Sequence, residues 1–249
     1  MKMKKLNWEF YLASGMVLLA ILFLMLHYYL FHDLHDIFYY LLLDVAFMFI
    51  QVLLVTLIIH RLLNEREKKG RLEKLNMVIG AFFSETGKEL LSMFTKADPS
   101  FVQVRENLIA KKEWESNNFV EAVKKLKDYS FTLNVDKSLL PVYKKFLHSN
   151  RNMLLRIIEN PTLLEHETFT ELLLAVFHVT EEFEARMDLC NLAKADEAHI
   201  AIDLSRVYKL LISEWIDYLK YLKTHYPFLY SLAVRTNPMD PDAKVEITE

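Results

Sequence analysis

The chain has 249 residues, of which 53% are hydrophobic and 25% are charged, and its formal net charge at pH 7 is −3. A charge this close to neutral does not support a general attraction to nucleic acid, so no nucleic-acid partner is expected. The single cysteine, Cys190, excludes an intrachain disulfide and suits a reducing compartment. Its neighbours Leu189 and Leu192 predict a buried structural thiol.

Two apolar runs follow one another at the start of the chain, at residues 10–31 and 37–59. Each is about as long as the ~20 residues that a helix needs to cross ~30 Å of hydrocarbon. The first run is longer than the ~7–15 apolar residues of a signal peptide, and no small-x-small cleavage site follows it. The sequence therefore predicts a transmembrane hairpin over residues 1–60, with the lipid bilayer as a partner.

The positions of lysine and arginine predict the orientation of this hairpin. Basic residues precede the first run, and the link at residues 32–36 has none. Basic residues also follow the second run, at Arg61, Arg66, Lys68, Lys69 and Arg71. Both termini are therefore predicted to be cytoplasmic in a two-pass protein of the cell membrane. The juxtamembrane basic residues would also contact anionic lipid headgroups.

The rest of the sequence predicts an all-α domain. Glycine occurs only four times, and apolar residues recur at three- and four-residue intervals, which is the helical period. Residues 61–76 are expected to continue the second membrane helix as a charged juxtamembrane helix. Residues 77–235 are expected to form an irregular cytoplasmic bundle of about five or six helices. Residues 236–249, which contain several Pro and Asp residues, are expected to be a flexible tail.

Local signals predict how parts of this bundle begin and pack. Asp98-Pro99 and Asn160-Pro161 each place an N-cap residue before a proline that can open a helix, the second helix running to about Leu189. A short apolar seam at three- and four-residue spacing would pack either on the domain or on a second copy of the chain. Its residues are Leu72, Leu75, Ile79 and Phe82.

Polar residues inside the second apolar run form the first candidate site. Asp44 and Gln51 are seven residues apart, so they project from nearly the same face of a helix, with Tyr40 one turn above. A carboxylate in a membrane segment is costly and indicates a functional hypothesis, such as a proton or cation site. The alternative is a protonated or snorkelling Asp44 that hydrogen-bonds across a helix dimer.

The link between the two runs forms a second candidate site, with His32, Asp33, His35 and Asp36. Imidazole and carboxylate groups are ligands for zinc or copper, and histidines near their titration range also suit a pH-dependent contact. The two aspartates also have an ordinary structural explanation, because they can cap the second membrane helix.

A third candidate is an acidic stripe on the helix after Pro161. Glu167, Glu171, His178 and Glu182 share one side of a helical wheel. A buried stripe of carboxylates and histidine would resemble a metal site in a helical bundle, although the Glu-x-x-His pair of di-iron bundles is absent. The other interpretation is a solvated helix face, and no cofactor or metal is expected with it.

The motifs that are missing favour binding over catalysis. The sequence has no glycine-rich phosphate loop, no Gly-x-Ser-x-Gly and no His-Glu-x-x-His. The predicted function is therefore that of a membrane-anchored helical interaction, scaffold or sensor module, with a protein partner or self-association. The alternative is an oligomeric ion channel or pore that uses Asp44 and Gln51. A membrane-bound enzyme that uses the acidic stripe is the third class.

Overall fold

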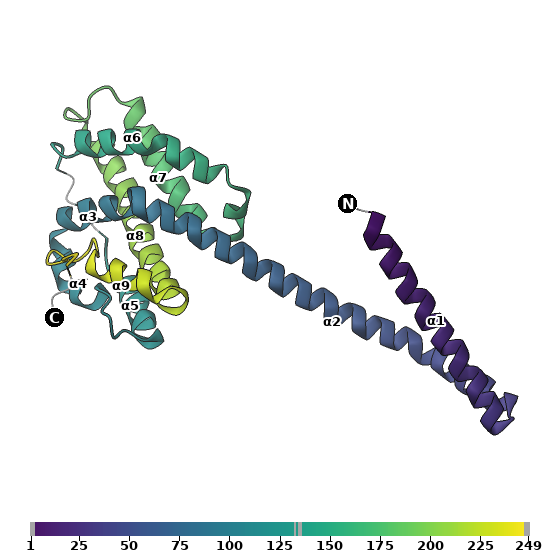
Figure 1. The fold of residues 1–249 in the computed structure, drawn as a ribbon. Coiled ribbons are helices and arrows are strands. Elements are labelled where there is room, and N and C mark those ends of the chain that lie inside the picture. The colour runs from purple at the N-terminus through teal and green to yellow at the C-terminus, as the bar shows by residue number, and fades with distance from the viewer. Residues whose placement is uncertain (1–2, 132, 134–135, 247–249) are drawn as a thin grey trace. The chain divides into compact units, whose positions relative to one another are not determined.

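The computed structural model describes residues 3–131, 133 and 136–246. Every regular element in these residues is helical, so the prediction of an all-α fold is confirmed. The chain divides into two compact units, Met1–Glu67 and Lys68–Glu249, which are considered separately (Figure 1).

The first unit is built from two apolar helices. Helix α1 spans Met3–Phe31, and helix α2 begins at Leu34 and continues to Phe82, beyond the end of this unit. Between them His32 has a φ of 53°, a left-handed conformation that often ends a helix. Both helices are long and apolar enough to cross a membrane, and no residue of their most apolar 18-residue windows is buried. Length and composition alone give only weak support to membrane association.

The second unit contains the end of α2 and seven further α-helices among the described residues. These are α3 (Lys88–Ala97), α4 (Val102–Leu108), α5 (Ser116–Asp128), α6 (Leu140–Ile158), α7 (Glu167–Ala185), α8 (Lys194–His225) and α9 (Pro227–Arg235). Helix α8 runs through this unit and packs against α3, α5, α7 and α9, while α6 packs on the other side of α7 (Figure 1). Helix α8 is therefore the central element of the bundle.

The two predicted N-caps are confirmed, but they open short turns instead of long helices. Asp98 accepts a hydrogen bond from the Ser100 N–H at 3.0 Å and begins the 3-10 turn Pro99–Phe101. Asn160 caps the 3-10 turn Pro161–Glu165 in the same way. Helix α7 begins only at Glu167, because His166 acts as a separate N-cap.

The predicted seam packs inside the second unit. Leu75, Ile79 and Phe82 are at most 1% exposed and belong to the domain core. Directly after them the chain forms a π-helical turn, which brings the Phe83 ring to 5.0 Å from the Trp215 ring of α8. The seam therefore attaches the end of α2 to the bundle.

Two details differ from expectation because tertiary contacts decide them. Asn237 and Met239, at the start of the expected flexible tail, are 1% and 2% exposed. The Asn237 Oδ1 atom accepts hydrogen bonds from the Trp215 Nε1–H at 3.3 Å and from the Met239 N–H at 3.1 Å. Cys190 is exposed and not buried, while the adjacent Leu189 fills the core position.

Candidate functional site

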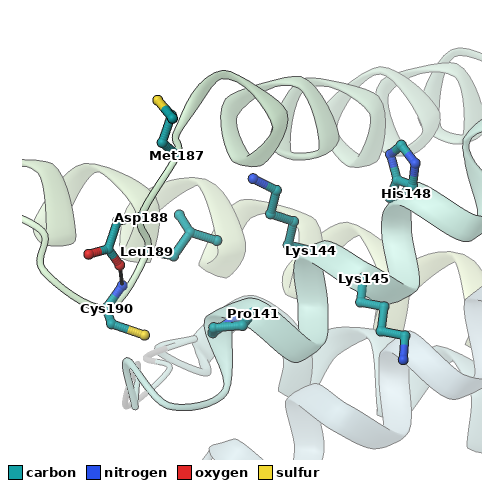
Figure 2. Close-up of a pocket in the computed structure, with 8 residues that line it drawn as sticks. All are labelled: Pro141, Lys144, Lys145, His148, Met187, Asp188, Leu189 and Cys190. Atoms are coloured by element: carbon teal, nitrogen blue, oxygen red, sulfur yellow. Dashed lines mark hydrogen bonds between the residues drawn. The ribbon is translucent and has the colours of Figure 1, made fainter.

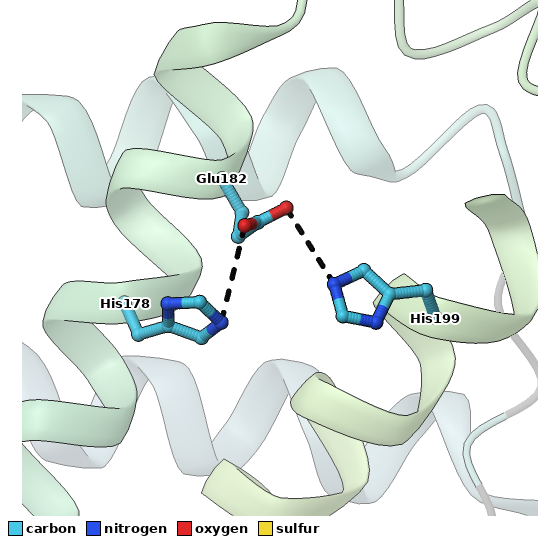
Figure 3. Close-up of side chains that lie close together, drawn as sticks. All are labelled: His178, Glu182 and His199. Carbon is cyan, nitrogen blue, oxygen red and sulfur yellow. Dashed lines mark ion pairs between the residues drawn. The ribbon is translucent and has the colours of Figure 1, made fainter.

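Four side chains on two adjacent helices form a cluster of imidazoles and carboxylates. His178 and Glu182 lie one turn apart on α7, and His199 and Asp203 lie one turn apart on α8. Residues four apart share a helix face, and α7 packs against α8. Each helix therefore presents one imidazole and one carboxylate to the other. Figure 3 shows the Glu182 carboxylate between the rings of His178 and His199.

The two histidines approach the same oxygen of Asp203. The Nε2 atom of His178 lies 3.2 Å from Asp203 Oδ2, and the Nε2 atom of His199 lies 3.4 Å from it. Glu182 is somewhat farther away, with its Oε1 atom 4.0 Å from His178 Nε2 and its Oε2 atom 3.7 Å from His199 Nε2. We call these four residues the His–carboxylate cluster.

Asp203 is the buried member of the cluster. It is 5% exposed, and its Oδ1 atom accepts a hydrogen bond from Arg206 at 3.0 Å. Among the described residues, its Oδ2 atom accepts no hydrogen bond, even though the two imidazole nitrogens are close. A buried acceptor without a partner costs about 1–3 kcal/mol, so this atom calls for a physical explanation.

Arg186, which is not part of the cluster, binds Glu182, the second carboxylate of the cluster. Its guanidinium donates to Glu182 Oε2 at 2.5 Å and to Asp196 Oδ1 at 2.6 Å. The hydrogen bond from Arg186 lowers the pKa of Glu182, which keeps that carboxyl group ionised. Arg186 and Arg206 each bind one oxygen of these two carboxylates. The other oxygens, Glu182 Oε1 and Asp203 Oδ2, lie 4.0 and 3.2 Å from the Nε2 atom of His178.

This arrangement has the donor set of a divalent metal site. Imidazole nitrogens and carboxylate oxygens are the ligands that zinc and related ions take in proteins. His178, Glu182 and His199 alone offer three ligand atoms that lie within 4.8 Å of one another. The same groups could instead form a network of ion pairs that ties α7 to α8.

The predicted acidic stripe is only partly assembled. His178 and Glu182 belong to the cluster, whereas Glu167 and Glu171 are exposed at the beginning of α7 and lie outside it. Sequence reasoning missed His199 and Asp203. The signal that could have found them is their spacing of four residues, which repeats the spacing of His178 and Glu182 on the next helix.

The polar candidates of the second apolar run are separated in the structure. Tyr40 and Asp44 line a cavity of about 580 Å³ between α1 and α2, together with His27 of α1. Gln51 is exposed and is not among the residues that line this cavity. The carboxylate of Asp44 therefore faces the partner helix of its own hairpin.

The residues of the link between α1 and α2 are explained mainly by capping. The Oδ1 atom of Asp33 accepts hydrogen bonds from the backbone N–H of His35 at 2.8 Å and of Asp36 at 3.4 Å. His32 and His35 have exposed side chains. Within the described part of the chain, the link shows no cluster of metal ligands, and a pH-dependent contact there stays a prediction.

The basic residues that follow the second apolar run lie on α2. Arg61 pairs with Glu65 at 3.1 Å, and both side chains are exposed. Arg66, Lys68 and Lys69 are exposed as well, and Arg71 follows on the same helix.

A basic cavity that sequence reasoning did not identify lies between α6 and the segment after α7 (Figure 2). It has a volume of about 430 Å³ and is lined by Lys144, Lys145 and His148 of α6. Cys190 lies at its edge, and the Lys144 ammonium donates to the Arg186 carbonyl at 2.7 Å. The cavity therefore combines positive charge with an exposed thiol.

Comparison with known proteins assigns both parts of the chain to one family. A family model described as the N-terminal helical domain of MJ1433 matches residues 3–63, and one described as the C-terminal helical domain of the uncharacterized protein MJ1433 matches residues 71–235. The uncharacterized protein MJ1433 of Methanocaldococcus jannaschii is 46% identical over 229 residues, which are 92% of each chain. No solved structure matches the chain. The chain therefore belongs to the MJ1433 family of helical proteins.

Proposed function

We propose that this protein is a two-pass membrane protein whose helical unit, Lys68–Glu249, acts at the cytoplasmic face as an interaction, scaffold or sensor module. The observation that carries the proposal is the exposure of the apolar stretches of α1 and α2, whose mean hydropathies are 2.2 and 2.6 with no buried residue in the window. Apolar surface of this extent is unfavourable in water. A bilayer is the solvent that would cover it.

The charge pattern supports the cytoplasmic placement. Basic residues concentrate at 61–71, and such residues favour the cytoplasmic side and anionic headgroups. A role in binding is supported by α9, where Phe228 is 70% and Leu232 is 43% exposed. These side chains offer apolar contact surface to a protein partner or to a second copy of the chain.

Cysteine labelling tests the topology, because Cys190 is exposed and is the only cysteine. A membrane-impermeant maleimide should leave Cys190 unlabelled in intact spheroplasts of an expression host and label it after permeabilisation. In a Cys190→Ser background, His35→Cys in the link should be labelled in intact spheroplasts. Labelling of Cys190 in intact spheroplasts would contradict this orientation. Release of the protein by alkaline carbonate would contradict membrane insertion.

An oligomeric ion channel is the second candidate function, and the placement of Tyr40 and Asp44 in the hairpin cavity favours it. In this case Asp44→Asn should reduce cation flux in proteoliposomes severalfold without changing the helical content by circular dichroism, because an amide cannot offer a cation the carboxylate that Asp44 provides. Wild-type proteoliposomes without flux, or an Asn variant with unchanged flux, would rule out this role for Asp44.

A further inference from the structure

We propose that His178, Glu182, His199 and Asp203 bind one divalent transition-metal ion, with Zn²⁺ as the ion that fits best, and that this ion joins α7 to α8. All four residues lie in the second unit. The proposal therefore does not depend on the membrane topology or on the function proposed above.

The distances in the cluster suit a tetrahedral ion. Zn–N and Zn–O bonds of about 2.0–2.1 Å place neighbouring ligand atoms about 3.3 Å apart. The distances from Asp203 Oδ2 to the Nε2 atoms of His178 and His199 are 3.2 and 3.4 Å. The Oε1 atom of Glu182 is 4.0 Å from His178 Nε2 and its Oε2 atom is 3.7 Å from His199 Nε2, so this side chain would have to move inward to complete the tetrahedron.

The unpartnered oxygen of Asp203 distinguishes this site from a simple ion-pair network. In such a network the imidazole N–H groups would donate to Oδ2, but among the described residues this buried atom accepts no hydrogen bond. A bound cation would give Oδ2 its missing partner and would use the lone pairs of both Nε2 atoms. One bound cation would thus explain both the unpartnered buried oxygen of Asp203 and the position of the two imidazole nitrogens beside it.

Contacts outside the cluster hold the carboxylates in place, as is usual for metal ligands. Arg206 donates to the outer oxygen of Asp203, and Arg186 bridges Glu182 and Asp196. These two guanidinium groups face the three carboxylates of Glu182, Asp196 and Asp203, so the acidic side chains in these ion pairs outnumber the arginines by one. The local charge therefore favours a cation.

The donor set points to zinc and not to calcium or magnesium. Calcium takes six to eight oxygen ligands and magnesium keeps an octahedron of oxygens and waters, whereas two imidazoles and two carboxylates suit Zn²⁺ and its spectroscopic substitute Co²⁺. Because the cluster contains no thiolate, the Co²⁺ form should show visible ligand-field bands of a tetrahedral ion without a sulfur charge-transfer band.

Direct metal binding to the purified full-length protein in detergent micelles tests the proposal. Metal-free protein is incubated with Zn²⁺ and passed through a desalting column, and the bound zinc is measured by elemental analysis. Its affinity is measured by competition with a chromophoric chelator. We expect one Zn²⁺ per chain. His199→Ala should weaken binding at least ~10-fold, because loss of a supporting contact alone typically costs 10–100-fold, and the double variant His178→Ala/His199→Ala should bind none.

Matched controls separate this site from other histidines. His148→Ala removes a histidine of α6 that pairs with Glu184 of α7 at 2.8 Å, and this variant should keep full zinc binding. His32→Ala/His35→Ala should also keep it. The replaced cluster histidines are 47% and 51% exposed, so their variants should fold, as circular dichroism can verify. Wild-type protein that binds no zinc, or a double variant that binds it as tightly, would overturn the proposal. Loss of zinc in the His32/His35 variant would overturn it too, by assigning the ion to the link.

Discussion

Replacement of Glu214 by glutamine should raise the free energy of unfolding by up to about 3 kcal/mol at pH 8 and change it little at pH 5. Glu214 lies on α8 and is 3% exposed. Burial raises its pKa from 4.5 to about 7. A hydrogen bond of 3.0 Å from the Thr168 hydroxyl opposes this rise, and the nearby carboxylate of Asp217 adds to it.

The direction of the effect follows from proton binding. Between pH 4.5 and 7 the folded protein keeps a proton on Glu214 that the unfolded chain has lost. The contribution of Glu214 to stability therefore falls as the pH rises through this window, and it stays low above pH 7. The pKa difference corresponds to about 3 kcal/mol at about 1.4 kcal/mol per unit. Glutamine keeps an acceptor for Thr168 and has no charge to bury.

His166 lies close to Glu214 and has the opposite pH dependence. Its Nε2 atom is 3.8 Å from Glu214 Oε1, and burial lowers the pKa of His166. A lowered histidine pKa gives stability that is lost as the pH falls below about 6.5. His166 is present in both the wild type and the Gln variant, so the difference between the two proteins at each pH reports Glu214 together with its coupling to His166.

Urea unfolding of the full-length protein in detergent, followed by circular dichroism at pH 5 and pH 8, measures this difference. Glu171→Gln on α7 is the matched control, because the Glu171 carboxylate is exposed and should have the same small effect at both pH values. If Glu214→Gln changed the free energy of unfolding equally at pH 5 and pH 8, Glu214 would not carry a raised pKa.

The parts of the fold that depend on local sequence could be predicted. The caps at Asp98 and Asn160 need only a side chain and the next backbone N–H groups, and both form. The two apolar helices follow from length and composition in the same way. The exposure of Cys190 and the burial of Asn237 could not be predicted, because each depends on which distant element packs beside it.

The candidate site could also be predicted only as far as local sequence determines it. A helical wheel places His178 and Glu182 on one face, but it cannot tell which other helix lies opposite that face. The wheel therefore grouped them with Glu167 and Glu171, although their actual partners, His199 and Asp203, come from α8. The seam of α2 is a parallel case, since its spacing fits both the domain core and a second copy. Its burial in the core, where the Phe82 ring lies 5.5 Å from the Phe169 ring of α7, depends on tertiary packing that the spacing does not reveal.

Zinc should stabilise the folded protein if the His–carboxylate cluster binds it. At a free Zn²⁺ concentration of about 100 times the Kd, the gain is about 2.7 kcal/mol. For a domain of this size, that gain should raise the Tm by about 5–10 °C. Thermal unfolding of the full-length protein in detergent, with and without Zn²⁺, measures the shift.

The variant Asp203→Asn should lose this zinc-induced shift and yet be at least as stable as the wild type when zinc is absent. An amide oxygen can still accept the hydrogen bond from Arg206, and the amide N–H₂ can donate to an imidazole nitrogen where the carboxylate oxygen has no partner. Asp196→Asn is the control, since Asp196 contacts Arg186 but is not a proposed ligand, and this variant should keep the shift. If Asp203→Asn instead destabilised the zinc-free protein and kept the zinc-induced shift, Asp203 would serve the ion-pair network alone.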